Sequence, residues 1–162
     1  MDSDYIIKIV LIGDQNVGKT TFFKKVSNID NDDSSSTIGV DYAIIYRMFN
    51  KNKLKIHLWD TAGQERFHSI IKNYFKNTSS AILFFDLNNE SSFDSIDLWI
   101  KEYKTMNTCE HKHPIILIGN KNDLKINVSY EKIKNIVIKY NLIYHQTSIK
   151  DSNIDIMFNT LI

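Results

Sequence analysis

The stretch GDQNVGKTTFF, Gly13 to Phe23, directly follows the apolar run YIIKIVLI, Tyr5 to Ile12. Its pattern Gly-x-x-x-x-Gly-Lys-Thr, placed between an expected strand and an expected helix, is the context that a phosphate-binding loop requires. Glycines let successive backbone N–H groups point inward at phosphate oxygens, and the helix N-terminus adds a partial positive charge. The alternative is an ordinary turn from strand to helix that carries two glycines by chance.

Two side chains of this motif have specific expected roles. Lys19 is placed to reach the terminal phosphates of a nucleotide, and the hydroxyl of Thr20 is placed to ligate Mg²⁺. The full set of expected nucleotide contacts in this stretch is Gly13, Asp14, Gln15, Asn16, Val17, Gly18, Lys19, Thr20 and Thr21.

The apolar pattern of the rest of the chain predicts an α/β fold. Short continuous apolar runs at 5–12, 81–85 and 115–118 are typical of parallel strands buried on both faces. Helical spacing recurs at 22–26, 93–103, 133–140 and 154–161, and alternation at 40–48 and 54–58 predicts a hairpin at one sheet edge. With a last strand at 143–147, we expect about six strands, mostly parallel, with one antiparallel edge strand and helices on both faces.

Composition bounds the class of protein. A chain of 162 residues with 43% hydrophobic residues fits one domain. Twenty basic and nineteen acidic side chains give a formal net charge of +1, which does not favour nucleic acid or an anionic membrane as a partner. The lone Cys109 cannot form an internal disulfide, and the start MDSDY has no signal-peptide pattern, so we expect a cytoplasmic protein. No apolar run approaches the roughly 18 residues of a membrane-spanning helix.

A second cluster, WDTAGQERF at 59–67, ends an alternating strand. Like the first motif, it is expected at the carboxyl ends of the strands. Asp60 can hold a metal from its far side, in the way that a Walker-B acid does. Gly63 can bring a backbone N–H against a terminal phosphate because it has no Cβ, and Gln64 can orient an attacking water. Taken alone, Asp60 is equally compatible with a helix N-cap.

A third cluster, NKND at 120–123, follows the buried run at 115–118. The carboxylate of Asp123 can accept hydrogen bonds from N1–H and the amino group of guanine, and adenine has no such pair of donors. The stem of Lys121 can lie along the ring plane, and Asn120 can tie this loop to the phosphate-binding loop. Alone, the tetrapeptide would be read as a polar turn after a strand.

Five motifs, GDQNVGKT, STIGVDY, WDTAGQERF, GNKND and TSIKD, occur in an order and at separations that resemble the small GTPases of the Ras superfamily, and most closely their Rab branch. The resemblance implies a P-loop NTPase fold forming a single G domain over residues 1–162, with GTP or GDP and Mg²⁺ as ligands. By the same resemblance, Thr37 would ligate Mg²⁺ and contact the γ-phosphate, and Ser148, Ile149 and Lys150 would line the guanine pocket. The implied metal set is Thr20, Thr37 and Asp60, and the implied catalytic set is Gln64, Lys19 and Thr37.

The sequence departs from the family pattern at three places. NIDNDDSSS replaces the aromatic that relatives place beside guanine, Ile149 replaces the usual alanine, and Gln15 and Asn16 stand where Ras proper has glycines. Three alternatives to a Rab-like GTP-hydrolysing switch therefore stay open. They are a guanine-nucleotide scaffold that scarcely hydrolyses GTP, a member of a non-Rab branch, and a P-loop kinase that uses ATP.

The resemblance also implies partners and a location. An exchange factor, a GTPase-activating protein and effectors would bind the loops around Thr37 and Gly63, and the aromatic set Phe49, Trp59, Phe67 and Tyr74 is either core or an effector-binding patch. Rab-like proteins act in vesicle trafficking on the cytosolic face of membranes through a prenylated tail. This sequence stops at Ile162 without a C-terminal cysteine, so the tail is expected to be missing from it, and we expect a monomer.

Overall fold

The structure, a computed structural model, describes residues 3–29, 37, 39–64, 68–107, 114–148, 150 and 158. Its strands are β1 (Tyr5–Ile12), β2 (Val40–Phe49), β3 (Asn52–Thr61), β4 (Ser80–Asp86), β5 (Ile115–Asn120) and β6 (Ile143–Gln146). Its helices are α1 (Lys19–Val26), α2 (His68–Ile71), the 3-10 helix η2 (Lys72–Phe75), α3 (Glu90–Asp94), α4 (Ile96–Met106) and α5 (Tyr130–Tyr140).

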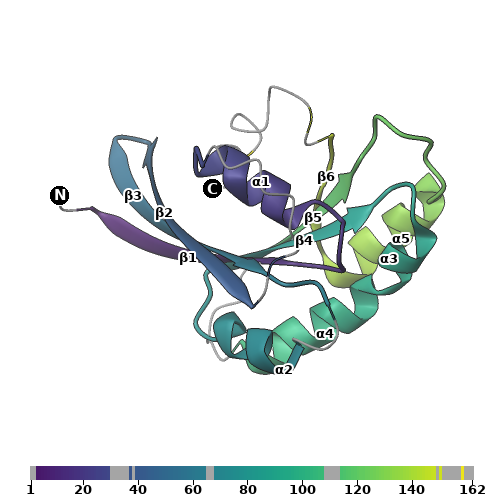
Figure 1. Cartoon of the computed structure of the whole chain (residues 1–162), viewed down its shortest axis with the longest axis horizontal. Coiled ribbons are helices and arrows are strands. Elements are labelled where there is room, and N and C mark those ends of the chain that lie inside the picture. The colour runs from purple at the N-terminus through teal and green to yellow at the C-terminus, as the bar shows by residue number, and fades with distance from the viewer. Residues whose placement is uncertain are drawn as a thin grey trace.

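The described strands form one six-stranded sheet in the order β2-β3-β1-β4-β5-β6 (Figure 1). Five strands run parallel, and β2 pairs antiparallel with β3 at the edge. Every residue of β4 and β5 is buried, because helices cover both faces of the middle of the sheet. The predicted α/β fold, with its mostly parallel sheet and single antiparallel edge strand, is therefore confirmed.

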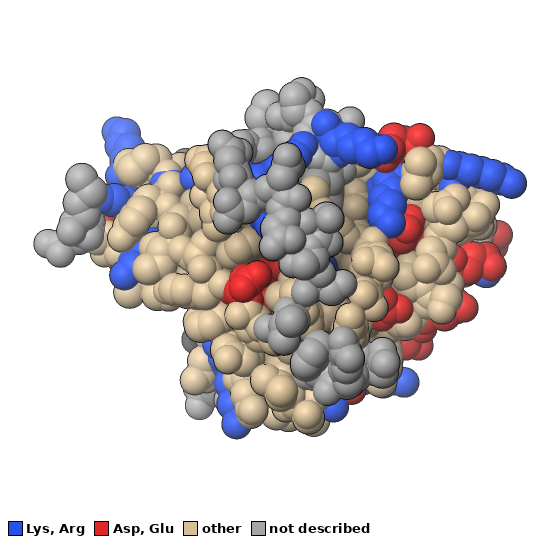
Figure 2. All heavy atoms as spheres, in the orientation of Figure 1, with Lys and Arg blue, Asp and Glu red and all other residues tan. Residues whose placement is uncertain are grey.

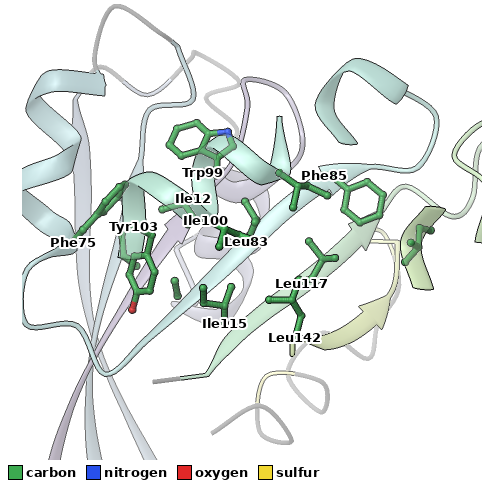
Figure 3. Packing of buried hydrophobic residues seen from close by; sticks show 14 of the residues in the cluster. Ile12, Phe75, Leu83, Phe85, Trp99, Ile100, Tyr103, Ile115, Leu117 and Leu142 are labelled. Atoms are coloured by element: carbon green, nitrogen blue, oxygen red, sulfur yellow. The ribbon is translucent and has the colours of Figure 1, made fainter. Parts of the chain in front are cut away.

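Two hydrophobic layers hold the helices to the sheet. On one face, α1 packs Phe22 against Phe84 of β4, with ring centroids 5.2 Å apart, and Phe22 also contacts Phe158. On the other face, Trp99 and Ile100 of α4 pack with Phe85 of β4 and Leu117 of β5 (Figure 3). The sheet is thus packed between α1 on one face and α4 on the other (Figure 1). This packing fixes the positions at which its strands end.

The structure refines several predicted boundaries. The polar turn expected at 50–53 is only two residues long, because Asn50 and Lys51 both have positive φ, at 46° and 71°, and β3 begins at Asn52. The helix expected over 93–103 is divided at Ser95 into α3 and α4. The sequence analysis did not predict α2 and η2, and of the helical pattern at 154–161 only the buried Phe158 lies within the described residues.

The surface has no dominant charge on the face shown in Figure 2, where basic and acidic side chains are interspersed over the described residues. Among the described helices, none combines the length and apolar character that crossing a bilayer demands.

Phe84→Ala is expected to lower the free energy of unfolding by about 3–5 kcal/mol, because it removes a buried ring of β4 that packs against Phe22 of α1 and leaves a cavity. Chemical denaturation of the wild type and the variant measures the difference. The matched control is Tyr130→Ala, whose side chain is 75% exposed and whose effect should stay within about 0.5 kcal/mol. Equal effects of the two substitutions would contradict this account of the core.

Candidate functional site

The loop between β1 and α1 has a backbone that most side chains would not allow. Gly13 has φ +131°, and a Cβ at this position would collide with the carbonyl oxygen of Phe84 in the neighbouring strand. Asn16 and Gly18 also have positive φ, at 63° and 106°. The loop therefore curls tightly over the ends of β1 and β4 instead of extending away from the sheet.

At the N-terminus of α1, no N-cap side chain and no acidic side chain of the first turn interacts with the backbone N–H groups. Its N-cap is Gly18, which has no side chain to accept a hydrogen bond, and the first turn contains no acidic residue. The first N–H groups of a helix and its dipole attract anions. The loop and the helix together therefore present a positive, donor-rich end, which is the geometry of a phosphate site.

Lys19 is a buried cation in the first turn of α1. Its side chain is only 5% exposed, and its Nζ donates to the carbonyl oxygens of Gly13 and Asp14 at 2.8 and 2.7 Å. Burial lowers the pKa of Lys19 to about 8, although the negative charges of Asp60 and Asp14 act in the opposite direction. An anionic ligand at this ammonium would offset the cost of burying the charge.

Three oxygen-bearing side chains converge beside Lys19. The hydroxyl of Thr20 donates to Oδ2 of Asp60 at 2.6 Å, and the hydroxyl of Thr37 lies 2.8 Å from that of Thr20 and 3.3 Å from the same carboxylate oxygen. Asp60 is fully buried, which raises its pKa to about 6, and its Oδ1 has no hydrogen-bond partner among the described residues. One buried carboxylate and two hydroxyls are hard oxygen ligands of the kind that Mg²⁺ prefers, so these residues fit that ion.

The segment after β3 lies directly against the phosphate-binding loop. A Cβ on Gly63 would collide with the backbone of Asp14 and Gln15, so only glycine permits this approach. The N–H of Ala62 donates to the carbonyl oxygen of Gly39 at 2.9 Å, which joins this segment to the start of β2. Gln64 directly follows Gly63 and is partly buried. Residues 65–67 lie outside the described residues.

The NKND loop meets the phosphate-binding loop through Asn120. Its Nδ2 donates to the carbonyl oxygen of Val17 at 2.8 Å, and Asn120 is 2% exposed. Asp123 accepts hydrogen bonds from Ser148 Oγ and Lys150 Nζ, both at 2.7 Å. The hydrogen bond from Lys150, and to a smaller extent that from Ser148, holds the pKa of Asp123 below its usual value. Its carboxylate is therefore an ionised acceptor at neutral pH. Ile149 lies outside the described residues.

The structure also shows contacts that the sequence analysis missed. The Asp14 carboxylate accepts from Ser95 Oγ and from Trp99 Nε1, each at 2.7 Å, which ties the phosphate-binding loop to α4. Lys121 forms an ion pair with Asp86 at 2.7 Å. For Asp86 a signal existed, because it directly follows an apolar run whose end was expected at the same sheet edge. For Ser95 and Trp99, more than 80 residues away along the chain, no sequence signal pointed to Asp14.

Tyr42, Trp59 and Tyr74 form an aromatic surface near the carboxyl end of β3. Trp59 is flanked by Tyr42, with ring centroids 4.4 Å apart, and by Tyr74, at 5.2 Å. The expectation from the sequence groups Trp59 and Tyr74 with Phe49 and Phe67. Instead, the structure adds Tyr42 and puts Phe49 at the far end of the hairpin, opposite Asn52, while Phe67 lies outside the described residues.

Comparison with known proteins gives consistent matches over nearly the whole chain. The family model described as "Ras family" matches residues 8–162. Rab-19 of Rattus norvegicus is 39% identical over 160 residues, which cover 96% of this chain and 73% of the relative. The GTP-binding protein ypt3 of Schizosaccharomyces pombe is 37% identical over 166 residues (98% and 75%), and Rab-8B of Homo sapiens is 37% identical over 162 residues (98% and 77%).

Asp60→Asn is expected to raise the free energy of unfolding of the nucleotide-free protein, kept in EDTA, by about 2–3 kcal/mol at pH 7. The pKa of Asp60 rises from 3.8 to about 6 on folding, so the folded state binds the extra proton and its stability falls as the pH rises through that window. The variant has no such group to ionise, and its advantage should disappear at about pH 4.

Denaturant titrations across this pH range measure the effect. Asp94→Asn, at an exposed position, is the control and should follow the wild type at every pH. A variant at position 60 that is less stable than the wild type at pH 7 would show that burial of the charge is not the dominant cost.

Proposed function

The chain belongs to the Ras family of small GTPases, with Rab proteins among its relatives, and from this premise we propose that it binds GDP and GTP with Mg²⁺ and hydrolyses GTP slowly. The proposal includes a switch role in intracellular membrane trafficking, exercised through partners that distinguish its two nucleotide states. One observation carries it. A buried lysine, a carboxylate with two hydroxyls, and the ionised carboxylate of Asp123 lie at the carboxyl ends of the strands of one sheet.

The phosphate end is served by Lys19 and the N-terminus of α1. The Lys19 ammonium is held beside the loop by two carbonyl oxygens, so it needs little reorganisation to meet a phosphate oxygen. The N–H groups at the start of α1 and along the curled loop add donors, and Gly63 allows a further backbone N–H to approach. These groups would hold the terminal phosphates and stabilise the charge that develops as the γ-phosphate leaves.

Thr20, Thr37 and Asp60 are the residues that would hold Mg²⁺ in this proposal. When bound, the ion neutralises charge on the β- and γ-phosphate oxygens. Thr37 belongs to the segment before β2, and Gly63 to the segment after β3. Both would contact the terminal phosphate end, so loss of the γ-phosphate would release both segments at once, which is how a partner would sense the nucleotide state.

The base end would select guanine through Asp123. Its ionised carboxylate offers two acceptor oxygens, and guanine offers two donors, N1–H and the amino group. Asn120 fixes the distance between this end and the phosphate-binding loop by its bond to Val17. An adenine base has no such pair of donors for the carboxylate, so we expect strong preference for guanine over adenine.

Hydrolysis without a partner should be slow, at roughly 10⁻³ s⁻¹ or less. Gln64 lies beside Gly63 and would orient the attacking water. Of the two arginines in the sequence, Arg47 donates to the carbonyl oxygens of Val26 and Tyr46, and Arg66 lies outside the described residues. Among the described residues no arginine contacts the candidate site, and we propose that a GTPase-activating protein supplies additional positive charge there.

Partner recognition would use the aromatic surface of Tyr42, Trp59 and Tyr74. Tyr42 is 42% exposed, and the three rings bridge β2, β3 and η2. Because β2 follows the segment of Thr37 and η2 follows the segment of Gly63, ordering of both segments by GTP would reshape this surface. An effector that packs on the rings would then prefer the GTP state.

Asp123→Asn is expected to weaken GDP binding by a factor of roughly a thousand or more, because the amide replaces one acceptor oxygen with a donor and opposes a guanine donor. Xanthosine diphosphate, which offers an oxygen in place of the amino group, should bind the variant better than GDP. Competition against fluorescent nucleotide in the presence of Mg²⁺ measures both affinities, with ATP as a further competitor. If ATP displaces GDP from the wild type as well as GTP does, the protein is not a guanine-specific switch.

Gln64→Leu is expected to reduce single-turnover GTP hydrolysis by the isolated protein by about tenfold or more, since the variant cannot orient water, while GDP affinity stays unchanged. Because Rab-like activating proteins can supply their own glutamine as well as an arginine, stimulated hydrolysis should fall less. A wild type that shows no hydrolysis with or without such proteins, yet binds GTP, would instead identify a nucleotide-binding scaffold.

A further inference from the structure

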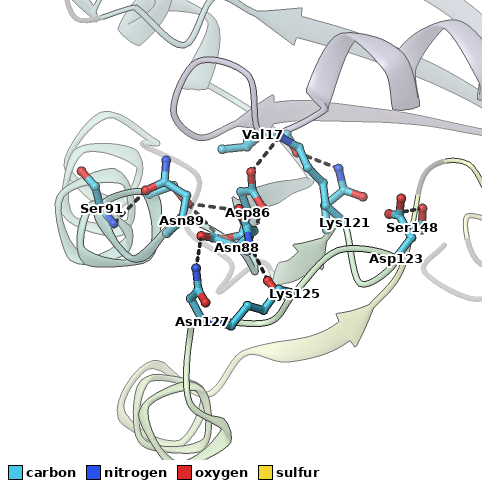
Figure 4. Close-up of polar contacts among 12 residues, drawn as sticks. Val17, Asp86, Asn88, Asn89, Ser91, Lys121, Asp123, Lys125, Asn127 and Ser148 are labelled. Carbon is cyan, nitrogen blue, oxygen red and sulfur yellow. Dashed lines mark hydrogen bonds and ion pairs between the residues drawn. The ribbon is translucent and has the colours of Figure 1, made fainter.

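The ion pair between Asp86 and Lys121 lies at the base end of the candidate site, between the ends of β4 and β5 (Figure 4). We propose that Asp86 is a positioning residue for nucleotide binding: it fixes the ammonium of Lys121 so that the lysine stem forms a preset platform for the purine ring. The inference rests on the proposed guanine-nucleotide binding. It adds a residue outside the five motifs to that site.

Asp86 is itself held rigidly. It is the last residue of β4, is paired in register with Asn120 of β5, and is 8% exposed. Its backbone N–H donates to Ser92 Oγ at 3.0 Å, and its Oδ1 accepts from the N–H of Asn88 at 2.9 Å. With one carboxylate oxygen committed to the backbone, the other points to Lys121 Nζ at 2.7 Å. The carboxylate is thus a fixed anchor, unlike a mobile surface acid.

Lys121 needs such an anchor. Its backbone has φ +63°, a conformation that directs the residue out of the strand into the loop, and its side chain remains 31% exposed. A free lysine side chain has many rotamers, and ordering it on ligand binding costs affinity. Because Asp86 holds the ammonium before any ligand binds, only the apolar stem is left to lie along a base, and much of that ordering cost is met in advance.

The surrounding loops support the same geometry. The N–H of Leu87 donates to the Asn120 carbonyl at 3.0 Å, and the N–H of Asn127 donates to the Leu87 carbonyl at 2.9 Å. Asn88 also binds the carbonyl oxygen of Lys125 through its Nδ2 at 2.6 Å. The loop after β4 is therefore joined by hydrogen bonds to the chain at Asn120, Lys125 and Asn127, on both sides of Lys121.

A double-mutant cycle tests the proposal, using Asp86→Asn, Lys121→Met and the double variant. Asparagine keeps an oxygen for the Asn88 N–H and removes the charge, and methionine keeps an apolar stem and removes the ammonium. The measurement is the dissociation rate of GDP carrying a fluorescent methylanthraniloyl group. D86N should dissociate about tenfold faster than the wild type. The double variant should dissociate at the rate of K121M alone, because Asp86 acts only through the lysine.

Controls separate positioning from stability. Asp97→Asn breaks a comparable ion pair with Lys139, at 2.8 Å on the surface, and should leave the dissociation rate unchanged. Thermal melts report folding of each variant, and Asp86→Ser repeats the cycle if D86N is unfolded. An unchanged rate in D86N, or effects of D86N and K121M that multiply in the double variant, would overturn this inference alone. Wild-type protein that binds no labelled GDP would overturn the proposed function, and this inference with it.

Discussion

A buried ammonium is the constraint on which this site depends. Lys19 is almost completely removed from water by its place in the first turn of α1, and its contacts are carbonyl oxygens that carry only partial charge. Burying a cation in this way costs free energy, which is why the pKa of Lys19 falls to about 8. A negatively charged ligand would offset this cost.

Asp60, whose negative charge acts on Lys19, is a buried anion. Its carboxylate is fully buried with one oxygen that lacks a partner, and its pKa is raised to about 6. The two groups attract each other, yet burial outweighs that attraction at both. In the proposed function a polyphosphate would complement the lysine and a divalent ion would complement the carboxylate. A ligand that brings both together would offset both costs, so a magnesium nucleotide would be favoured over either component.

At the proposed base end, hydrogen bonds orient the side chains before any ligand binds. This end differs from the proposed phosphate end, where buried charges lack full compensation. Asp123 is oriented by Ser148 and Lys150, and Asn120 is tied to the phosphate-binding loop through Val17. The contacts of Asp123 join the ends of the neighbouring strands β5 and β6, whereas the bond from Asn120 passes the end of β4 to reach the loop after β1. Affinity at this end would come from rigidity, whereas affinity at the phosphate end would come from relief of buried charge.

The sequence by itself determined the sheet and most strand ends, because apolar periodicity is a local property of the chain. The fixed spacing of its motifs also predicted Lys19, Thr20, Asp60 and Asp123 as site residues. It missed the division of a helix at Ser95, the short α2 and η2, and the contacts of Asp14 and Asp86. These contacts join residues that are far apart along the chain and meet only when parallel strands and helices pack, so only the tertiary structure decided them. Local pattern fixes which side chains reach the sheet edge, and packing fixes which of them touch.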